Sequence, residues 1–365
     1  MPHASAKPNH KRVPSRVSWP ERIFILADDL TGACDSAAAF LRAGRAVRVW
    51  IGASASFPAT EPVQAFNTDS RSLRPAKASR IVSRAAAALA AHPKALVFKK
   101  IDSAARGPFA AEILAAHRAF GTRAVLLAPA FPAAGRTVRN GNLEIHDAAG
   151  GCAQIDIAGL FTPRTRSLVH FVSRPQELSM ALKSAKPVLL CDSSTQSDLA
   201  ALVRNAEKQR GLLFAGSAGL ARALASREAR RRRSVPPPTA SRTLIVAGTD
   251  HPATQLQLAR LDRGKAGNVR VLRLHHSRRD HARILDAFRT FAPEALILTG
   301  GDTALFAAST LGAHSFILQG ELAPGIPWGI VQGGMAEGCI VITKSGGFGT
   351  STVFNEILNL LRGEA

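Results

Sequence analysis

Residues Arg22–Ala43 read R-I-F-I-L-A-D-D-L-T-G-A-C-D-S-A-A-A-F-L-R-A, and this stretch decides the fold. An apolar run over 23–26 stops at two adjacent carboxylates, Asp28 and Asp29, and an alanine-rich segment follows Gly32. The run predicts a buried strand, and the alanines predict a helix. A strand that ends in acidic residues and leads into a helix is typical of open α/β sheets, which bind ligands beyond the carboxyl ends of their strands.

The rest of the chain repeats this pattern. Short Val/Ile/Leu runs alternate with alanine-rich segments over 365 residues, which is long enough for two domains. We therefore expect two α/β domains, each a largely parallel sheet flanked by helices. An arginine run followed by Pro236–Pro238 marks the domain junction, because a stiff polyproline segment does not fit inside a sheet. The expected divisions are a disordered basic tail over 1–20, domains over 21–224 and 242–365, and a linker or loop over 225–241.

The composition of the chain limits the classes of partner and the cellular location that we expect. The net charge is +21, partly in the tail and around 227–233, but no nucleic-acid-binding module is recognisable, so we expect an anionic small molecule rather than nucleic acid as partner. No apolar run approaches the roughly 20 residues that span a bilayer, and no signal peptide precedes Trp19. Four scattered cysteines lack zinc-site spacing. These features predict a cytoplasmic protein without membrane contact.

Charged residues gather where the predicted strands of the first half end. Cationic side chains there could hold the carboxylate of a polyhydroxy acid, and an aspartate could accept a hydroxyl proton or hold a metal ion. For any single member a surface salt bridge is the alternative, and Asp28 or Asp29 could instead cap the following helix. The set consists of Asp28, Asp29, Arg71, Lys99, Lys100, Asp102, Ser103 and Arg106.

Two glycine-bearing turns in the second half follow predicted strands, at 300–303 and 344–349. Glycine lets the backbone approach a phosphate closely, and helix N-termini attract anions. Neither turn matches the P-loop or the G-x-G-x-x-G pattern, and each alone is more often a tight turn. Their occurrence together in one domain favours phosphate binding. His251, in a loop before a helix, is expected as an exposed helix cap.

Eight motifs, in this order, resemble the four-carbon acid sugar kinase family, whose members phosphorylate threonate, erythronate or oxo-tetronates with ATP. The resemblance covers residues 22–361. The motifs are I-L-A-D-D-L-T-G-A at 25–33, N-T-D-S-R-S-L at 67–73, K-K-I-D-S-A-A-R-G at 99–107, P-A-F-P-A-A-G-R-T at 129–137, A-G-S-A-G-L-A at 215–221, T-G-G-D-T at 299–303, G-E-L-A-P-G-I-P-W-G at 320–329 and K-S-G-G-F-G at 344–349.

The resemblance implies an N-terminal acid-sugar domain, a C-terminal nucleotide domain, and a site in the cleft between them. It implies ATP as a substrate, and phosphoryl transfer also needs Mg²⁺. Our hypothesis is that Asp28 or Asp29 takes the proton from a terminal hydroxyl. The substrate-binding candidates are Asp28, Arg71, Lys100, Ile101, Asp102, Ser103 and Arg106. The nucleotide-binding candidates are Gly300, Gly301, Asp302, Thr303, Gly346, Gly347 and, as a departure from the family pattern, His251.

The chain departs from this pattern in two places. His251 stands where the family usually has a serine that touches the nucleotide, and the segment after Leu143, around 144–163, looks shortened. A hairpin is expected there, around Gly141-Asn142. Two other functions stay open: a catalytically impaired relative that binds a sugar acid or nucleotide as a regulator, and a dehydrogenase, against which the missing G-x-G-x-x-G argues. The metal ligands, the acid and its stereoisomer, and a homodimer are left undecided.

Overall fold

The computed structural model describes residues 20–52, 60–146, 151–207, 209–227, 235–262, 268–275, 277 and 279–364. The expected tail over 1–20 lies outside these residues except for Pro20, as does part of the expected linker, 228–234. Within the described ranges, helix α7 (Ala218–Ala225) ends at the first residue of this expected linker over 225–241, and strand β12 (Thr243–Ala247) begins after it.

The N-terminal half is built on a parallel sheet, as its alternating pattern predicts. Its strands follow the order β2-β3-β1-β4-β11-β5-β10-β9. Most are short apolar runs buried along their whole length, which is typical of strands covered on both faces. The strands are β1 (Ile23–Ala27), β2 (Val47–Trp50), β3 (Val63–Asn67), β4 (Leu96–Lys100), β5 (Ala124–Ala128), β9 (Val169–Val172), β10 (Val188–Cys191) and β11 (Leu212–Gly216).

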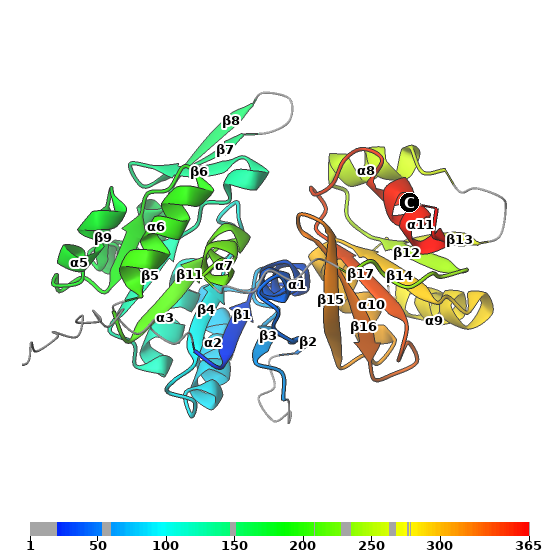
Figure 1. Ribbon diagram of the computed structural model, residues 1–365, viewed down its shortest axis with the longest axis horizontal. Coiled ribbons are helices and arrows are strands. Elements are labelled where there is room, and N and C mark those ends of the chain that lie inside the picture. The colour runs from blue at the N-terminus through cyan, green and yellow to red at the C-terminus, as the bar shows by residue number, and fades with distance from the viewer. Residues whose placement is uncertain are drawn as a thin grey trace, which may run out of the picture.

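Helices cover both faces of this sheet (Figure 1). The longer ones are α1 (Leu30–Ala38), α2 (Pro75–Leu89), α3 (Phe109–Phe120), α6 (Gln196–Ala206) and α7. Short ones are α4 (Pro163–Arg166), α5 (Leu178–Ala181), η1 (Ala39–Leu41), η2 (Pro132–Ala134), η3 (Ala158–Leu160) and η4 (Pro175–Glu177). Helix α1 is buried at every position, because it lies between the sheet of its own half and the C-terminal half.

A small antiparallel sheet projects from the N-terminal half (Figure 1) and consists of β6 (Arg136–Arg139), β7 (Asn142–His146) and β8 (Cys152–Asp156). Arg139 pairs with Asn142, which leaves Asn140 and Gly141 as a two-residue turn with φ of 49° and 71°. Positive φ at both positions is what an Asn-Gly hairpin turn requires. The predicted hairpin is confirmed.

The C-terminal half contains the parallel strands β13-β12-β14-β17, followed by the antiparallel strands β16 and β15. Their bounds are β13 (Val269–Arg273), β14 (Ala295–Thr299), β15 (Ser315–Ala323), β16 (Ile326–Gln332) and β17 (Ile340–Lys344). The helices are α8 (Pro252–Ala259), α9 (Asp280–Phe291), α10 (Gly301–Thr310) and α11 (Val353–Arg362). None of the helices in the described ranges is long and apolar enough to cross a membrane.

The two parallel sheets that the sequence predicts are present, and strands β2 and β15 join them edge to edge. These two strands pair antiparallel, from Ser315 opposite Trp50 to Leu318 opposite Val47, which makes a single 14-stranded sheet. The parallel strands of the two halves therefore run in opposite directions across the join. Helix α1, which starts at the end of β1, contacts α10, β15 and β17 and lies between the halves in Figure 1.

Candidate functional site

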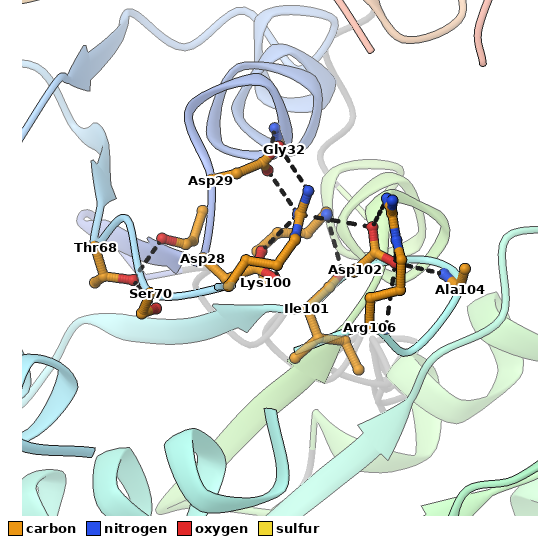
Figure 2. Close-up of polar contacts among 12 residues, drawn as sticks. Asp28, Asp29, Gly32, Thr68, Ser70, Lys100, Ile101, Asp102, Ala104 and Arg106 are labelled. Atoms are coloured by element: carbon orange, nitrogen blue, oxygen red, sulfur yellow. Dashed lines mark hydrogen bonds and ion pairs between the residues drawn. The ribbon is translucent and has the colours of Figure 1, made fainter. Parts of the chain in front are cut away.

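The two adjacent carboxylates at the end of β1 have different surroundings. Asp29 is the N-cap of α1: its Oδ1 accepts a hydrogen bond from the Gly32 N–H (2.8 Å), and its Oδ2 accepts one from the Thr31 hydroxyl (2.8 Å). The expected helix cap is therefore Asp29. Asp28 does not cap the helix and is 2% exposed. Figure 2 shows both side chains at the start of α1.

Arg71 connects these carboxylates. Its Nε and Nη2 donate to the two oxygens of Asp28 (2.9 and 3.0 Å), and its Nη1 donates to Asp29 Oδ2 (2.8 Å). Its Nη2 also lies 3.7 Å from Asp102. The backbone N–H groups of Ser70 and Arg71 donate to the Asp28 carbonyl, and these hydrogen bonds fix the loop after β3 so that the Arg71 side chain reaches both carboxylates. A planar guanidinium suits such two-point binding of carboxylates.

The charges of this cluster shift the pKa values of its members. Burial alone raises the pKa of Asp28, but the positive charges of Arg71, Lys99 and Lys100 outweigh it, and the net pKa is lowered. Burial likewise lowers the pKa of Arg71, yet the neighbouring Asp29 and Asp28 raise it above its ordinary value. Both partners are therefore held in their charged forms.

The loop after β4 adds a second arginine–carboxylate pair. Arg106 donates from Nε and Nη2 to the two oxygens of Asp102 (2.8 and 2.7 Å), and Asp102 also accepts from the Ala104 N–H (3.1 Å). Arg71, which binds Asp28 and Asp29, connects this pair to them through its contact with Asp102, and Figure 2 shows Asp102 and Arg106 to one side of the two aspartates. Burial raises the pKa of Asp102, but its hydrogen bonds from Arg106 and the charge of Arg71 make the net shift strongly downward.

The remaining candidates from this loop differ in their contacts. Lys100 Nζ donates to the Ile101 carbonyl (2.9 Å) and lies beside Gly32 at the start of α1. The Ile101 side chain is buried, so only its backbone can meet a polar ligand. Ser103 is partly exposed in the same loop. Lys99 points to the other face of the sheet, where its Nζ lies 2.9 Å from Glu112 on α3, and it does not belong to the site.

In the C-terminal half, the turn at 300–303 leads from β14 into α10. Gly300 has φ of 97°, which favours glycine, and α10 begins at Gly301. Asp29 lies directly against Gly301, so that a Cβ at this position would overlap Asp29 Oδ2. The site residues of the N-terminal half therefore meet the N-terminus of α10, which carries the partial positive charge of the helix.

The second glycine-bearing turn lies next to the first. A Cβ on Gly300 would lie 3.2 Å from Thr249 Cβ, and one on Gly346 would lie 3.0 Å from Thr249 Oγ1. The His251 ring covers Gly347 at a similar distance, and its Nδ1 accepts from the Ala253 N–H, so the expected helix cap is present. The structure thus brings together both turns and His251.

Comparison with known proteins identifies the family. Residues 23–224 match the model of a "Sugar-binding N-terminal domain", and residues 281–354 match that of a "Nucleotide-binding C-terminal domain". The chain is 30% identical to a D-threonate kinase of Bordetella bronchiseptica, over 93% of this chain and 97% of that protein. The chain belongs to the four-carbon acid sugar kinase family. The family predicted from the eight motifs is confirmed, and with it the expectation of an enzyme of the sugar-acid kinase class.

Other relatives of this kinase family agree with the assignment. A D-threonate kinase of Salmonella typhimurium is 27% identical over 92% of this chain and 97% of its own length. The crystal structure of a Haemophilus influenzae protein of the DUF1537 family superposes with a TM-score of 0.66, at 19% identity, over 93% of this chain and all of that one. At this identity the second comparison supports the fold alone.

For this family member, three residues near the site were not among the predicted site residues. Asp69 follows β3 with φ of 47°, and burial together with the charges of Asp302 and Asp29 raises its pKa. Arg136 has a buried Nε with no hydrogen-bond partner in the described residues. Lys344 lies buried at the end of β17. All three lie within the motifs quoted above, and this is the feature of the sequence from which their place near the site could have been predicted.

The pKa of His251 responds to cationic side chains of both halves of this kinase. Burial lowers the pKa of His251, and the positive charges of Lys344, Arg106 and Arg136 lower it further. Burial also lowers the pKa of Arg136, and the nearby charge of Arg106 acts in the same direction, against Asp102. Side chains of both halves therefore concentrate positive charge at one place, which favours an anionic ligand there.

Proposed function

We propose that the protein transfers the terminal phosphoryl group of ATP to a hydroxyl group of a four-carbon sugar acid. The observation that carries this proposal is the contact of Asp29 with Gly301, because it joins the carboxylate cluster of one half to the helix N-terminus of the other. Relatives named D-threonate kinase, and one named D-erythronate kinase at 27% identity over half of the chain, support this substrate class.

In this proposal Asp29 orients the acceptor hydroxyl and takes its proton. Asp29 is better placed than Asp28, because Asp29 lies against Gly301 of the other half, whereas both oxygens of Asp28 accept from Arg71. Asp28 would position Arg71. The substrate carboxylate and hydroxyls would bind Lys100, Asp102, Ser103, Arg106 and the backbone of Ile101. Phosphoryl transfer depends mainly on such positioning and on charge neutralisation.

The nucleotide phosphates would bind to the N-terminus of α10 and to the turn at 344–349. Gly300, Gly301, Asp302 and Thr303 would contribute from the first turn, and Gly346 and Gly347 from the second. Arg106 and Arg136, from the N-terminal half, would neutralise charge that develops on the transferred group. Positive charge around His251 suits this role.

Asp302 and Asp69 are the best candidates for holding Mg²⁺. The described residues contain no cluster of three or more metal-ligating side chains. Mg²⁺ that accompanies a nucleotide needs only one or two carboxylates beside the phosphates. Burial, and then the charges of Asp302 and Asp29, raise the pKa of Asp69, and a cation beside these carboxylates would offset that repulsion. When bound, the ion would supply charge neutralisation for the phosphates.

The test is ADP release with Mg-ATP and a panel of threonates, erythronates and oxo-tetronates of both configurations. We expect turnover with one acid and a loss of kcat by about 10²-fold or more in Asp29→Asn, which keeps the helix cap. Glu337→Gln, on the surface of the C-terminal half, controls for loss of a carboxylate. Undiminished turnover in Asp29→Asn would refute its role as base. The cytoplasmic location and the homodimer stay predictions.

A second candidate is a regulator that binds a sugar acid or nucleotide without turnover. The position of His251 favours it, because a Cβ on Gly347 would lie 3.0 Å from the His251 Nε2, so the ring occupies space above the proposed phosphate-binding turn. Thermal stabilisation by ADP or by one acid, without ADP release from ATP, would select this function. His251→Ser should then restore turnover if the ring is the obstacle.

A further inference from the structure

Lys344 is buried directly beneath the turn at 345–349. Its side chain is 0% exposed, and its ammonium lies within hydrogen-bond distance of three carbonyl groups of this turn: those of Ser345 (3.1 Å), Gly346 (3.3 Å) and Phe348 (3.3 Å). The Nζ also lies 3.2 Å from the Thr254 hydroxyl and faces the ring of Phe354. A lysine that ends a strand and binds the turn after it holds several peptide groups in one orientation.

Two side chains of α8 hold the same turn from the same side. The Thr254 hydroxyl donates to the Gly346 carbonyl (2.7 Å). Gln257 Nε2 lies within 3.2 Å of the carbonyls of Phe348, Gly349 and Thr350. The carbonyls of the turn are therefore directed inward, toward Lys344 and α8.

Inward carbonyls require outward N–H groups, because the N–H and C=O of a trans peptide point in opposite directions. The carbonyls of Ser345 and Gly346 face Lys344, so the N–H groups of Gly346 and Gly347 point away from it. Successive outward N–H groups form an anion-binding concavity.

The charge of Lys344 has no carboxylate partner in the described part of the chain: none lies within 4.0 Å of its Nζ. This distinguishes it from the other fully buried lysine, Lys99, which pairs with Glu112. Burial lowers the pKa of Lys344 to about 7. The positive charge of Lys344 is one of the causes that lower the pKa of His251. An anion at the turn would stabilise the charged ammonium.

We propose that Lys344 is a positioning residue for the nucleotide: it orients the N–H groups of Gly346 and Gly347 toward the phosphates, which in turn balance its buried charge. This inference rests on the proposed kinase function and adds to it. Lys344 touches no substrate in this account and acts through the turn. Binding of a nucleotide should therefore weaken when the ammonium is removed, whereas binding of the sugar acid should not change.

The test is calorimetric titration of the whole protein with ADP, for the wild type, Lys344→Met and Thr254→Val. Lys186→Met, at an exposed position of the N-terminal half, is the control for loss of one positive charge. We expect ADP binding to weaken by about tenfold or more in Lys344→Met and by about threefold in Thr254→Val, which removes the hydrogen bond to the Gly346 carbonyl and the contact with the Lys344 ammonium. The KM for the acid should stay within about twofold of the wild-type value in these variants. A similar weakening of both acid and ADP binding would indicate that the substitution disturbs the whole protein.

A second readout separates this role from a purely structural one. At about pH 8, where much of the Lys344 population is neutral, ADP binding by the wild type should take up protons, as shown by titrations in buffers of different ionisation enthalpy. Lys344→Met should lose this uptake. If that variant fails to fold, the wild-type uptake together with Thr254→Val decides the question.

The outcomes separate the two proposals. Equal ADP affinity and equal proton uptake in the wild type and Lys344→Met would overturn the role of Lys344 and leave the kinase proposal standing. No ADP binding by the wild type would overturn the kinase proposal and this inference with it.

Discussion

Asp29 lies against Gly301, and this contact joins the end of strand β1 to the start of helix α10 across the two halves of the molecule. Gly301 has no positive φ, so its backbone does not itself require glycine. What requires glycine is the closeness of the carboxylate, because any Cβ would overlap Oδ2. The absence of a side chain at Gly301 therefore allows the two halves of the site to approach this closely.

Gly301→Ala tests this spacing. The methyl group would force Asp29 and α10 apart, and a misplacement of about 1 Å can reduce turnover by about 10²-fold. We expect kcat to fall by this order, while the free energy of unfolding changes little because alanine is a better helix residue than glycine. Steady-state kinetics and urea titration measure the two effects. The control is Gly52→Ala, where a Cβ meets nothing within 4 Å; full activity of Gly301→Ala would show that the contact does not matter.

Arg71→Met should destabilise the fold strongly. It removes the cation that pairs with Asp28 and Asp29, which are 2% and 5% exposed, and breaking one side of a buried ion pair costs about 3–5 kcal/mol. Adding Asp28→Asn should recover part of this loss, because one buried charge is then removed. Urea titration gives the free energies of unfolding.

Arg106→Met provides the comparison for Arg71. The Arg106 side chain is 68% exposed, so its pair with Asp102 is weakened by solvent and its loss should cost only about 1 kcal/mol. Asp102 is itself 5% exposed, so the two pairs differ mainly in the exposure of the arginine, and equal destabilisation by the two substitutions would mean that this exposure does not determine the cost.

Lys99 should matter for stability and not for substrate binding. Its Nζ pairs with Glu112 where both side chains are 0% exposed, on the face of the sheet away from the site. Lys99→Met leaves Glu112 charged and buried, which we expect to cost about 3–5 kcal/mol, and Glu112→Gln in addition should recover much of it. The double-mutant cycle is measured by urea unfolding. If Lys99→Met folds but its KM for ATP or for the acid changes by well over about twofold, Lys99 does contribute to ligand binding.

The sequence predicted the end of β1 well, because local signals suffice there. An apolar run, two aspartates and an alanine-rich segment predicted strand, acidic turn and helix, and Asp29 as one of two candidate caps. Lys99 and Lys100 show the limit of this reasoning. Both follow the same buried run, but strand alternation places them on opposite faces, and only the structure shows that Glu112 occupies one of those faces.

The join between the halves could not be predicted in the same way. Strands β15 and β16 contain Gly320, Pro327 and Gly329, which weaken the strand pattern, and neither strand was expected. The pairing of β15 with β2 connects residues more than 260 positions apart, and no local pattern encodes it. Lys344 and Arg136 were missed as site residues for a similar reason: their roles depend on which distant carbonyls and charges surround them.

Asp35 should make stability depend on pH. It lies on α1, 3.5 Å from Arg222 Nη2, and this guanidinium also binds Glu321 on β15 (2.9 Å), so the group links the two halves. Burial raises the pKa of Asp35 to about 6, despite the opposing charge of Arg222. The unfolded value is about 3.9, so between these values the folded protein binds more protons than the unfolded chain. The contribution of Asp35 to stability therefore falls as pH rises from about 4 to about 6, and is constant above that.

Asp35→Asn should remove this dependence, because asparagine does not titrate. We expect the wild type to lose about 1–3 kcal/mol relative to Asp35→Asn between about pH 4 and pH 6. Urea unfolding at a series of pH values measures the difference curve, and Asp286→Asn, at an exposed position on α9, controls for loss of a carboxylate. Parallel curves for the wild type and Asp35→Asn would contradict the prediction. A wild type that gains stability over this range relative to Asp35→Asn would mean that Arg222 outweighs burial and holds Asp35 ionised.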